Sequence, residues 1–270
     1  MHRAGSLLAG LMGLLLAGAA PGAAIAQGGM MAHVDLNSPK MSEAELSREE
    51  VVAILQAPRQ DQPSSLADKS LNGLDLSGLD FSGVDLSRAR LNRANLKGAV
   101  LKGATLDLAW LIEADLEGAD LREASMIQTQ LIRARLADAD LSGARVVANF
   151  EGAHLVDAKL VNASMAPDMR NQSMGLMRTV FRSAVLDGAD LSGTDLAWAD
   201  MEFAKVRDAV LVDVDFNMAR LGGIDLTGSD VRGMNVAGAN LASAKLRQLN
   251  GEDAMKGLDE ARNLRRAFRD

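Results

Sequence analysis

A large apolar residue recurs at every fifth position over most of the chain, and this period constrains the fold more than any other feature. The series begins at Leu71 and continues through Leu76, Phe81, Leu86 and Leu91. A helix needs a period of about 3.6 and a flat strand a period of 2, so neither keeps positions i and i+5 on one face. A backbone that turns a corner every five residues does. Four such sides close a square coil, and the next coil stacks on it at about 4.8 Å, the strand spacing.

Two further positions of the repeat support this geometry. The residue two before the large one is small: between Ala89 and Ala144 it is alanine at 11 of 12 positions, with Thr129 as the exception. An interior that holds a leucine on each side has space there for little more than a methyl group. The residue two after the large one is often glycine, as at Gly73 and Gly78, which suits a corner with unusual backbone angles.

The repeats form three runs of 16, 4 and 15 units. The register slips by one residue near 147–150, and residues 166–175 interrupt it, which predicts a loop insertion there. Four units per coil predict that residues 20 apart stack, so Leu101 is expected to lie directly above Phe81. The solenoid is expected to span residues 66–249.

The A-(D/N)-L-x-x pattern, as in Ala94-Asn95-Leu96, resembles the pentapeptide-repeat family. This resemblance implies an all-β solenoid, a right-handed quadrilateral parallel β-helix. Some members of the family inhibit or protect DNA gyrase by imitating DNA. In related proteins a C-terminal module often makes a dimer, so the resemblance also offers a homodimer as one assembly.

Short helices are predicted at both ends of the solenoid. Within residues 27–65, we expect a mobile leader, a capping helix and a connector, because capping-box patterns begin at Ser42 and Ser47 ahead of an apolar patch. Within residues 250–270, apolar residues at three- and four-residue steps predict one amphipathic C-terminal helix, which would cap the last coil or pair with a second copy.

Residues 1–26 are predicted to be a signal peptide. Arg3 precedes an apolar stretch, and small residues before Gln27 predict cleavage after Ala26. A retained membrane anchor is the alternative, but the apolar run is short for a span of about 20 residues. We therefore expect a periplasmic or secreted protein without a transmembrane segment after signal removal. The chain has no cysteine, which excludes disulfides, thiol catalysis and a lipoprotein anchor.

The sequence offers no arrangement of residues for catalysis. Its three histidines, His2, His33 and His154, lack partners at zinc-ligand spacing, and none accompanies a serine in a nucleophile motif. We therefore predict a protein that is not an enzyme and has no cofactor and no metal site. One alternative is a methionine-based copper site in the periplasm, because Met165, Met169, Met174 and Met177 flank the interruption. Flexible core filling is the commoner use of methionine.

Outward aspartates precede many of the large apolar residues, and Asp195 is expected to stack on Asp215. Two interpretations stay open. The carboxylates form either a solvated surface that keeps the stack soluble or an acidic rod that imitates DNA and binds gyrase. Export and interspersed basic residues such as Arg88 and Lys97 disfavour the second. With a formal net charge of −7, direct contact with nucleic acid is not expected.

Two tryptophans, Trp110 and Trp198, occupy outward positions. Exposed tryptophan is favoured at binding spots, although packing under a loop is the alternative. The sequence thus predicts an exported, non-enzymatic module for interaction with an unknown protein partner, or a scaffold, with Trp110, Trp198, Asp195 and Asp215 as candidate contacts.

Overall fold

The computed structural model describes residues 35–57, 64–167 and 177–270. The chain divides into two units, Met1–Leu36 and Asn37–Asp270. Only residues 35 and 36 of the first unit are described, so the fold below is that of the second. The predicted signal peptide, and all but two residues of the predicted insertion at 166–175, lie outside the described residues.

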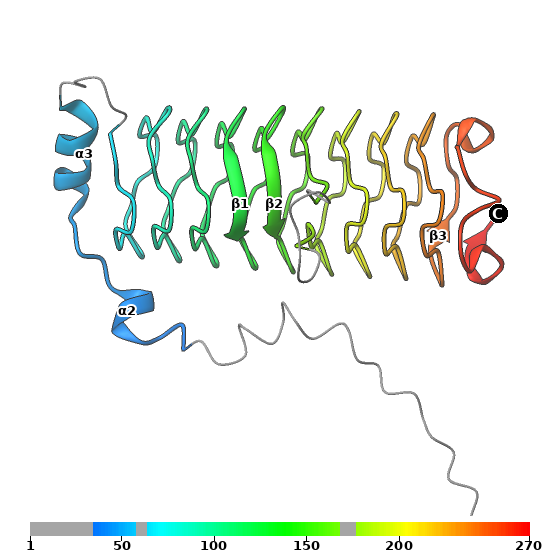
Figure 1. The fold of residues 1–270 in the computed structure, drawn as a ribbon, viewed down its shortest axis with the longest axis horizontal. Helices are drawn as coiled ribbons and strands as arrows, with labels where there is room; N and C mark the ends of the chain where they lie inside the picture. The colour runs from blue at the N-terminus through cyan, green and yellow to red at the C-terminus, as the bar shows by residue number, and fades with distance from the viewer. Residues whose placement is uncertain (1–34, 58–63, 168–176) are drawn as a thin grey trace, which may run out of the picture. The chain divides into compact units, whose positions relative to one another are not determined.

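The body of the second unit is a stack of four-sided coils (Figure 1). Parallel bridges join equivalent positions of successive coils, as between Asp80 and Val100, and the Phe81 amide donates to the Val100 carbonyl at 2.7 Å. Leu101 therefore continues the column of Phe81, and both side chains are fully buried. The predicted quadrilateral parallel β-helix is confirmed. Most sides are too short to form regular strands; the exceptions are β1 (Ser125–Gln130), β2 (Arg145–Asn149), β3 (Lys245–Leu246) and β4 (Phe268–Arg269).

The interior has one large and one small buried position on each side of the coil. Where the small position carries a hydroxyl, that hydroxyl donates to a main-chain carbonyl of the preceding coil. The Thr129 hydroxyl donates to the Leu106 carbonyl at 2.8 Å, and the Ser229 hydroxyl donates to the Val206 carbonyl at 2.7 Å. Since a buried hydroxyl without a partner is costly, this bond explains why Thr129 is tolerated in the alanine column.

The outward Asp or Asn of the repeat is part of the backbone hydrogen bonding. In most units its Oδ1 accepts the amide two residues later, as Asp215 does from Asn217 at 2.8 Å. In four described units that lack Asp or Asn at this position, an Asn or Asp side chain of the preceding coil accepts the amide instead. For example, the amide of Ile112, two residues after Trp110, donates to Asn92 of the preceding coil at 3.1 Å. The amide is satisfied in both arrangements.

The stack contains two irregularities. Strands β1 and β2 pair in parallel, but the register shifts between Ile127 and Gln130, so Gln130 pairs with Asn149 rather than with Phe150. One coil is therefore one residue short, at the place where the sequence period slips. Beyond it, Asn149 pairs with Val180, and the chain between Ser164 and Val180 holds the insertion.

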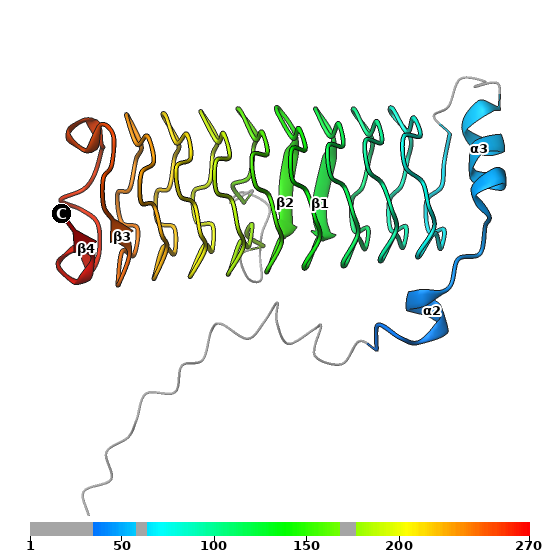
Figure 2. The ribbon, with the colours of Figure 1, turned by 180° about the vertical axis from the view of Figure 1, so that it is seen from behind.

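The N-terminal end is covered by α3 (Arg48–Gln56), which Figure 2 shows from behind. The short helix α2 (Pro39–Ser42) lies beside the first coils, where the side chains of Asn72 and Asn92 donate to its Lys40 and Met41 carbonyls. Ser47 forms the predicted capping box with Glu50, and Val51 is fully buried against the first coil. Ala44 also forms an antiparallel bridge with Leu71. The predicted N-terminal capping helix is confirmed. No helix in the described part of the chain has the length and apolarity needed to cross a membrane.

The single C-terminal helix predicted over residues 250–270 is wrong. The tail forms one more, wider coil: Asn250, Lys256 and Arg262 bridge the preceding coil at six-residue steps, and β4 pairs with β3. Two 3-10 helices, η1 (Glu252–Ala254) and η2 (Leu264–Arg266), lie at its turns. Apolar residues recur at every third position, from Met255 to Ala267. That spacing resembles the steps of an α-helix, but here it places two apolar residues on each six-residue side.

Candidate interaction surface

The four candidate contacts lie on two different walls of the solenoid. Wall A is the column of outward residues that contains Arg145, Ser164, Asp195, Asp215 and Asn235. Asp195 and Asp215 face outward on adjacent coils, and Trp198 occupies the corner after Asp195, with its amide bonded to the Asn217 carbonyl at 2.9 Å. Trp110 belongs to wall B, between Arg90 and Gln130. The structure therefore brings three of the four residues together and places Trp110 elsewhere.

Wall A carries an uncharged band, which sequence reasoning missed. The band consists of the two positions that follow each buried centre from Met126 to Val236, apart from Val147, Ala148 and Pro167, which are buried. Its surface members are Ile127, Gln128, Ala166, Ala197, Trp198, Asn217, Met218, Ala237 and Gly238. Equivalent positions on the other walls carry charges, such as Glu202, Arg207 and Arg232. Reading outward residues in stacked columns, rather than along the chain, would have identified this band.

Trp198 is partly exposed and adopts a left-handed backbone conformation, with φ 65°. This conformation is uncommon for a bulky residue, but every regular corner of the coil requires it. Met218 occupies the next corner on wall A with φ 59°, and its side chain lies over Gly238 of the following coil. The corner side chains thus form an apolar edge beside the uncharged band.

The carboxylates of Asp195 and Asp215 are only partly satisfied. Each Oδ1 accepts the amide two residues later, and Asp215 also accepts the Asn235 side chain at 2.9 Å. Within the described residues neither carboxylate forms an ion pair, whereas Asp225 pairs with Lys245 at 2.9 Å and Asp200 pairs with Arg182 at 2.9 Å. Wall A therefore carries both Trp198 and two carboxylates that form no ion pair with a described residue.

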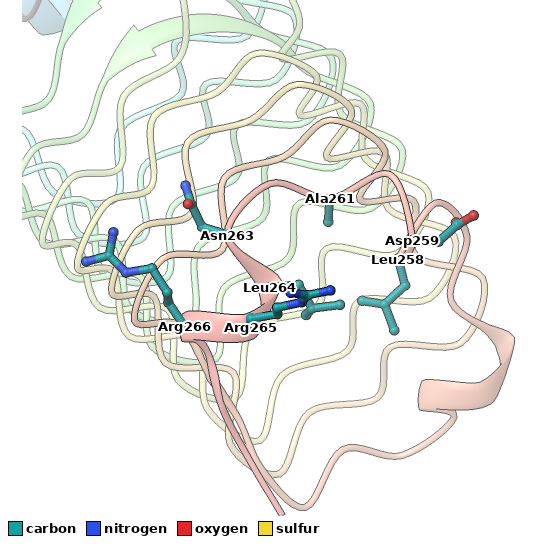
Figure 3. A pocket seen from close by; sticks show the side chains of 7 residues that line it. All are labelled: Leu258, Asp259, Ala261, Asn263, Leu264, Arg265 and Arg266. Carbon is teal, nitrogen blue, oxygen red and sulfur yellow. The ribbon is translucent and has the colours of Figure 1, made fainter.

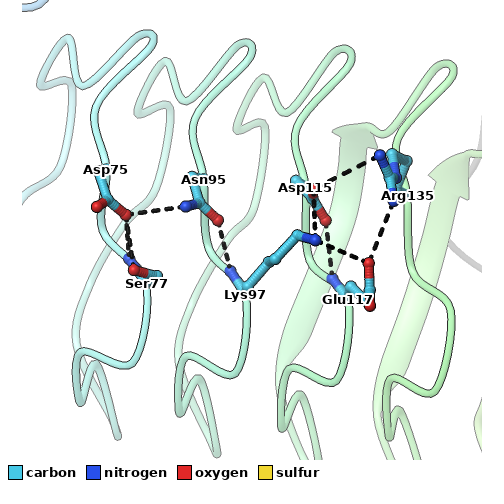
Figure 4. Close-up of polar contacts among 7 residues, drawn as sticks. All are labelled: Asp75, Ser77, Asn95, Lys97, Asp115, Glu117 and Arg135. Carbon is cyan, nitrogen blue, oxygen red and sulfur yellow. Dashed lines mark hydrogen bonds and ion pairs between the residues drawn. The ribbon is translucent and has the colours of Figure 1, made fainter.

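Charges on the wall that contains Asp75, Asn95, Asp115 and Arg135 are instead neutralised between coils (Figure 4). Lys97 lies 2.9 Å from Glu117 and 3.5 Å from Asp115, and Arg135 reaches Glu117 at 3.2 Å. The hydrogen bond from Lys97 holds the pKa of the Glu117 carboxyl below its usual value. This part of the wall offers a binding partner little unsatisfied charge.

No group of three or more His, Cys, Asp or Glu residues in the described part of the chain is arranged to hold a metal ion. Met169 and Met174 of the proposed copper site lie outside the described residues. Met165 is fully buried in the core, where it fills a large position of the repeat. That placement corresponds to core filling rather than to an outward thioether ligand.

A hollow of about 460 Å³ opens in the C-terminal coil (Figure 3). Leu258, Ala261 and Leu264 give it an apolar lining, and Arg265 lies beside Leu264. Sequence reasoning missed this hollow because it predicted a helix over the same residues. The predicted homodimer through that helix has no corresponding element in the structure.

Comparison with known proteins agrees with this geometry. A family model described as pentapeptide repeats matches residues 70–107, 109–146, 176–213, 195–233 and 219–250. Among solved structures, the chain is similar to HetL from the cyanobacterium Nostoc sp. strain PCC 7120, a pentapeptide repeat protein involved in heterocyst differentiation regulation. The two are 30% identical over 83% of this chain and 95% of that chain, with a TM-score of 0.49.

Two other solved structures are more distant. QnrB1, a plasmid-mediated fluoroquinolone resistance protein, is 16% identical over 74% of this chain and 93% of its own, with a TM-score of 0.28. A pentapeptide repeat protein of the Arabidopsis thaliana thylakoid lumen is 30% identical over 48% of this chain and 70% of its own, with a TM-score of 0.22. No curated protein sequence matches the chain. Because the family model covers more than half of the residues, the chain belongs to the pentapeptide-repeat family, whose right-handed quadrilateral β-helix it forms.

Proposed function

We propose that this chain is an exported, non-enzymatic pentapeptide-repeat protein that acts as a rigid protein-interaction or scaffold module, and that it binds its partner through wall A around Trp198. The observation that carries the proposal is the position of Trp198. Its partly exposed indole is part of the uncharged band, on the wall where Asp195 and Asp215 form no ion pair with a described residue. Aromatic anchors of this kind contribute most of the binding energy in many interfaces.

The coil geometry supports a rigid role. Each side is hydrogen-bonded to the coils before and after it, as Leu196 is to Asp215 and Asp215 is to Thr194. A surface that is ordered before binding loses little conformational entropy on association. Wall A can therefore present side chains at fixed spacing to a partner.

The gyrase-binding alternative has less support from the walls. An acidic rod needs carboxylates that are free to replace phosphates, but several outward aspartates form ion pairs, such as Asp120 with Arg122 and Asp230 with Arg232.

The binding test compares Trp198→Ala with Trp110→Ala in crosslinking and capture of the exported protein from its native periplasm. We expect Trp198→Ala to lose the crosslinked partner and Trp110→Ala to retain it, with both variants folded by circular dichroism. A partner retained by Trp198→Ala and lost by Trp110→Ala would place the interface on wall B instead.

Export is tested separately by cell fractionation and N-terminal sequencing. We expect the mature chain in the periplasm or the medium, beginning at Gln27. Full-length protein in the cytoplasm would contradict export, while the capture experiment on wall A would still decide the binding surface.

A further inference from the structure

We propose that the partner of wall A is an extended, cationic protein segment whose arginine or lysine side chain binds between Asp195 and Asp215, beside the Trp198 indole. This inference rests on the proposed function and specifies its partner. It follows from the charge, the aromatic residue and the relief of this part of wall A.

The charge on this part of wall A is negative, and no cationic side chain among the described residues forms an ion pair with it. Asp195 and Asp215 are paired neighbours on adjacent coils, so their main chains lie about 4.8 Å apart. Arg145, in the same column, is separated from Asp195 by the coil of Ser164. Two like charges at this spacing repel each other, and a cation between them attracts each carboxylate and offsets that repulsion.

Trp198 favours an arginine or lysine side chain as that cation. An arginine or lysine over an indole face gains a cation–π interaction, and arginine in addition bonds carboxylates through two parallel N–H groups. The same side chain can therefore contact the aromatic ring and a carboxylate together. A free metal ion would use only the carboxylates, and an apolar segment would leave both charges unpaired.

The short side chains of the band leave room for a partner segment in extended conformation. Ala197 and Ala237 alternate along wall A with Asn217, whose side chain is held by the Ala237 carbonyl at 3.1 Å. These short side chains leave a level surface beside the edge formed by Trp198 and Met218. A partner segment in extended conformation can lie on it, because alternate side chains then point toward the wall.

The test uses the full exported chain with Trp110→Phe, which leaves Trp198 as its sole tryptophan. The probe is an acetylated and amidated peptide of alternating valine and arginine, and the reference peptide has glutamine in place of arginine. We expect the arginine peptide to change the Trp198 fluorescence with an affinity about tenfold higher than the glutamine peptide. The reciprocal protein, Trp198→Phe, keeps Trp110 on wall B and should show no such change.

The charge requirement is tested by Asp195→Asn together with Asp215→Asn. Asparagine preserves the fold at this position, since Asn235 in the same column accepts the Ala237 amide at 3.1 Å. This variant should bind the arginine and glutamine peptides equally. The matched control, Asp140→Asn with Asp190→Asn, removes two carboxylates from another wall and should retain the tenfold preference.

The outcomes separate the two proposals. If Trp198→Ala loses the native partner while Asp195→Asn/Asp215→Asn retains it, the cationic partner is wrong and the interaction surface stands. If Trp198→Ala retains the partner, the surface itself is wrong. An equal loss of peptide affinity in both double variants would show a general effect of net charge and would overturn the local site.

Discussion

The rings of Phe150 and Phe181 stack with centroids 4.6 Å apart and planes within 9°, although the insertion lies between them in the sequence. They occupy the same core column on the two sides of that insertion. Thr179, two residues before Phe181, closes the coil there: its hydroxyl shares its one proton between the carbonyls of Val146 and Met165. The two stacks of coils therefore share one continuous interior.

This stacking predicts that Phe181→Ala destabilises the whole solenoid. Removal of a fully buried phenylalanine should lower the free energy of unfolding by about 3–5 kcal/mol. Phe181→Leu, which has the side chain most common in the column, should cost less than half as much. Urea unfolding followed by circular dichroism measures both. A similar small loss in the two variants would mean that the column is not continuous across the insertion.

A second prediction separates backbone strain from steric conflict at the corners. Gly78 and Gly223 have nearly equal φ, 66° and 68°, but a Cβ at Gly78 meets nothing within 4 Å, whereas one at Gly223 meets Phe203 Cδ1 at 2.6 Å. Gly78→Ala should cost about 1–2 kcal/mol from the left-handed conformation alone. Gly223→Ala should cost about 0.5–1.5 kcal/mol more, because the exposed Phe203 ring must shift away from the new methyl group.

The control for this comparison is Gly223→Ala in a Phe203→Ala background. Removal of the ring should reduce the loss to that of Gly78→Ala, measured by urea unfolding of each pair. Persistence of the larger loss without the Phe203 ring would show that steric contact is not its cause.

The sequence predicts the core of this fold because its information is local and repeated. Leucine at every fifth position indicates both which side chains point into the core and that four sides close one coil. The same pattern recurs in every unit, so each unit supports the same prediction. The tail lacks that redundancy: it has a single coil, in which Asn250, Lys256 and Arg262 follow one another at six-residue steps. Its apolar spacing of three fits a helix as well as a six-residue side, so only the contacts with the preceding coil decide between them.

The binding surface is less predictable from sequence than the core. The outward direction of Trp198 follows from its place in the repeat, but its proximity to Asp215 requires the stacking of successive coils. The hydrogen-bonding role of the outward aspartates was not predicted at all. It depends on the direction of an amide two residues later, which the repeat pattern does not reveal.

That hydrogen-bonding role gives a third prediction, at Asp215. Asp215→Ala removes the acceptor of the Asn217 amide and should lower the free energy of unfolding by about 1 kcal/mol. Asp215→Asn keeps an Oδ1 acceptor and should be nearly neutral. Hydrogen exchange at the Asn217 amide provides a local readout: it should accelerate in the alanine variant only. Equal acceleration in both variants would assign the effect to the charge rather than to the acceptor.

The fourth prediction concerns acid. The hydrogen bond from Arg207 holds the pKa of Asp187 below its usual value, against the opposing effect of burial. A carboxyl whose pKa is lower in the folded state stabilises the fold above its unfolded pKa of about 3.9 and loses that contribution as the pH falls through its folded pKa. The urea midpoint should therefore be flat from pH 7 to about pH 5 and fall below about pH 4. In Asp187→Asn, which has no proton to bind, the fall should be smaller. The matched control is Asp138→Asn, at an exposed position without an ion pair in the described structure.

The ion pair of Asp187 with Arg207 lies at the surface, so high salt should reduce the difference in urea midpoint between the protein and its Asp187→Asn variant. A fall of equal size in the protein and in both variants would mean that Asp187 does not contribute to the acid response.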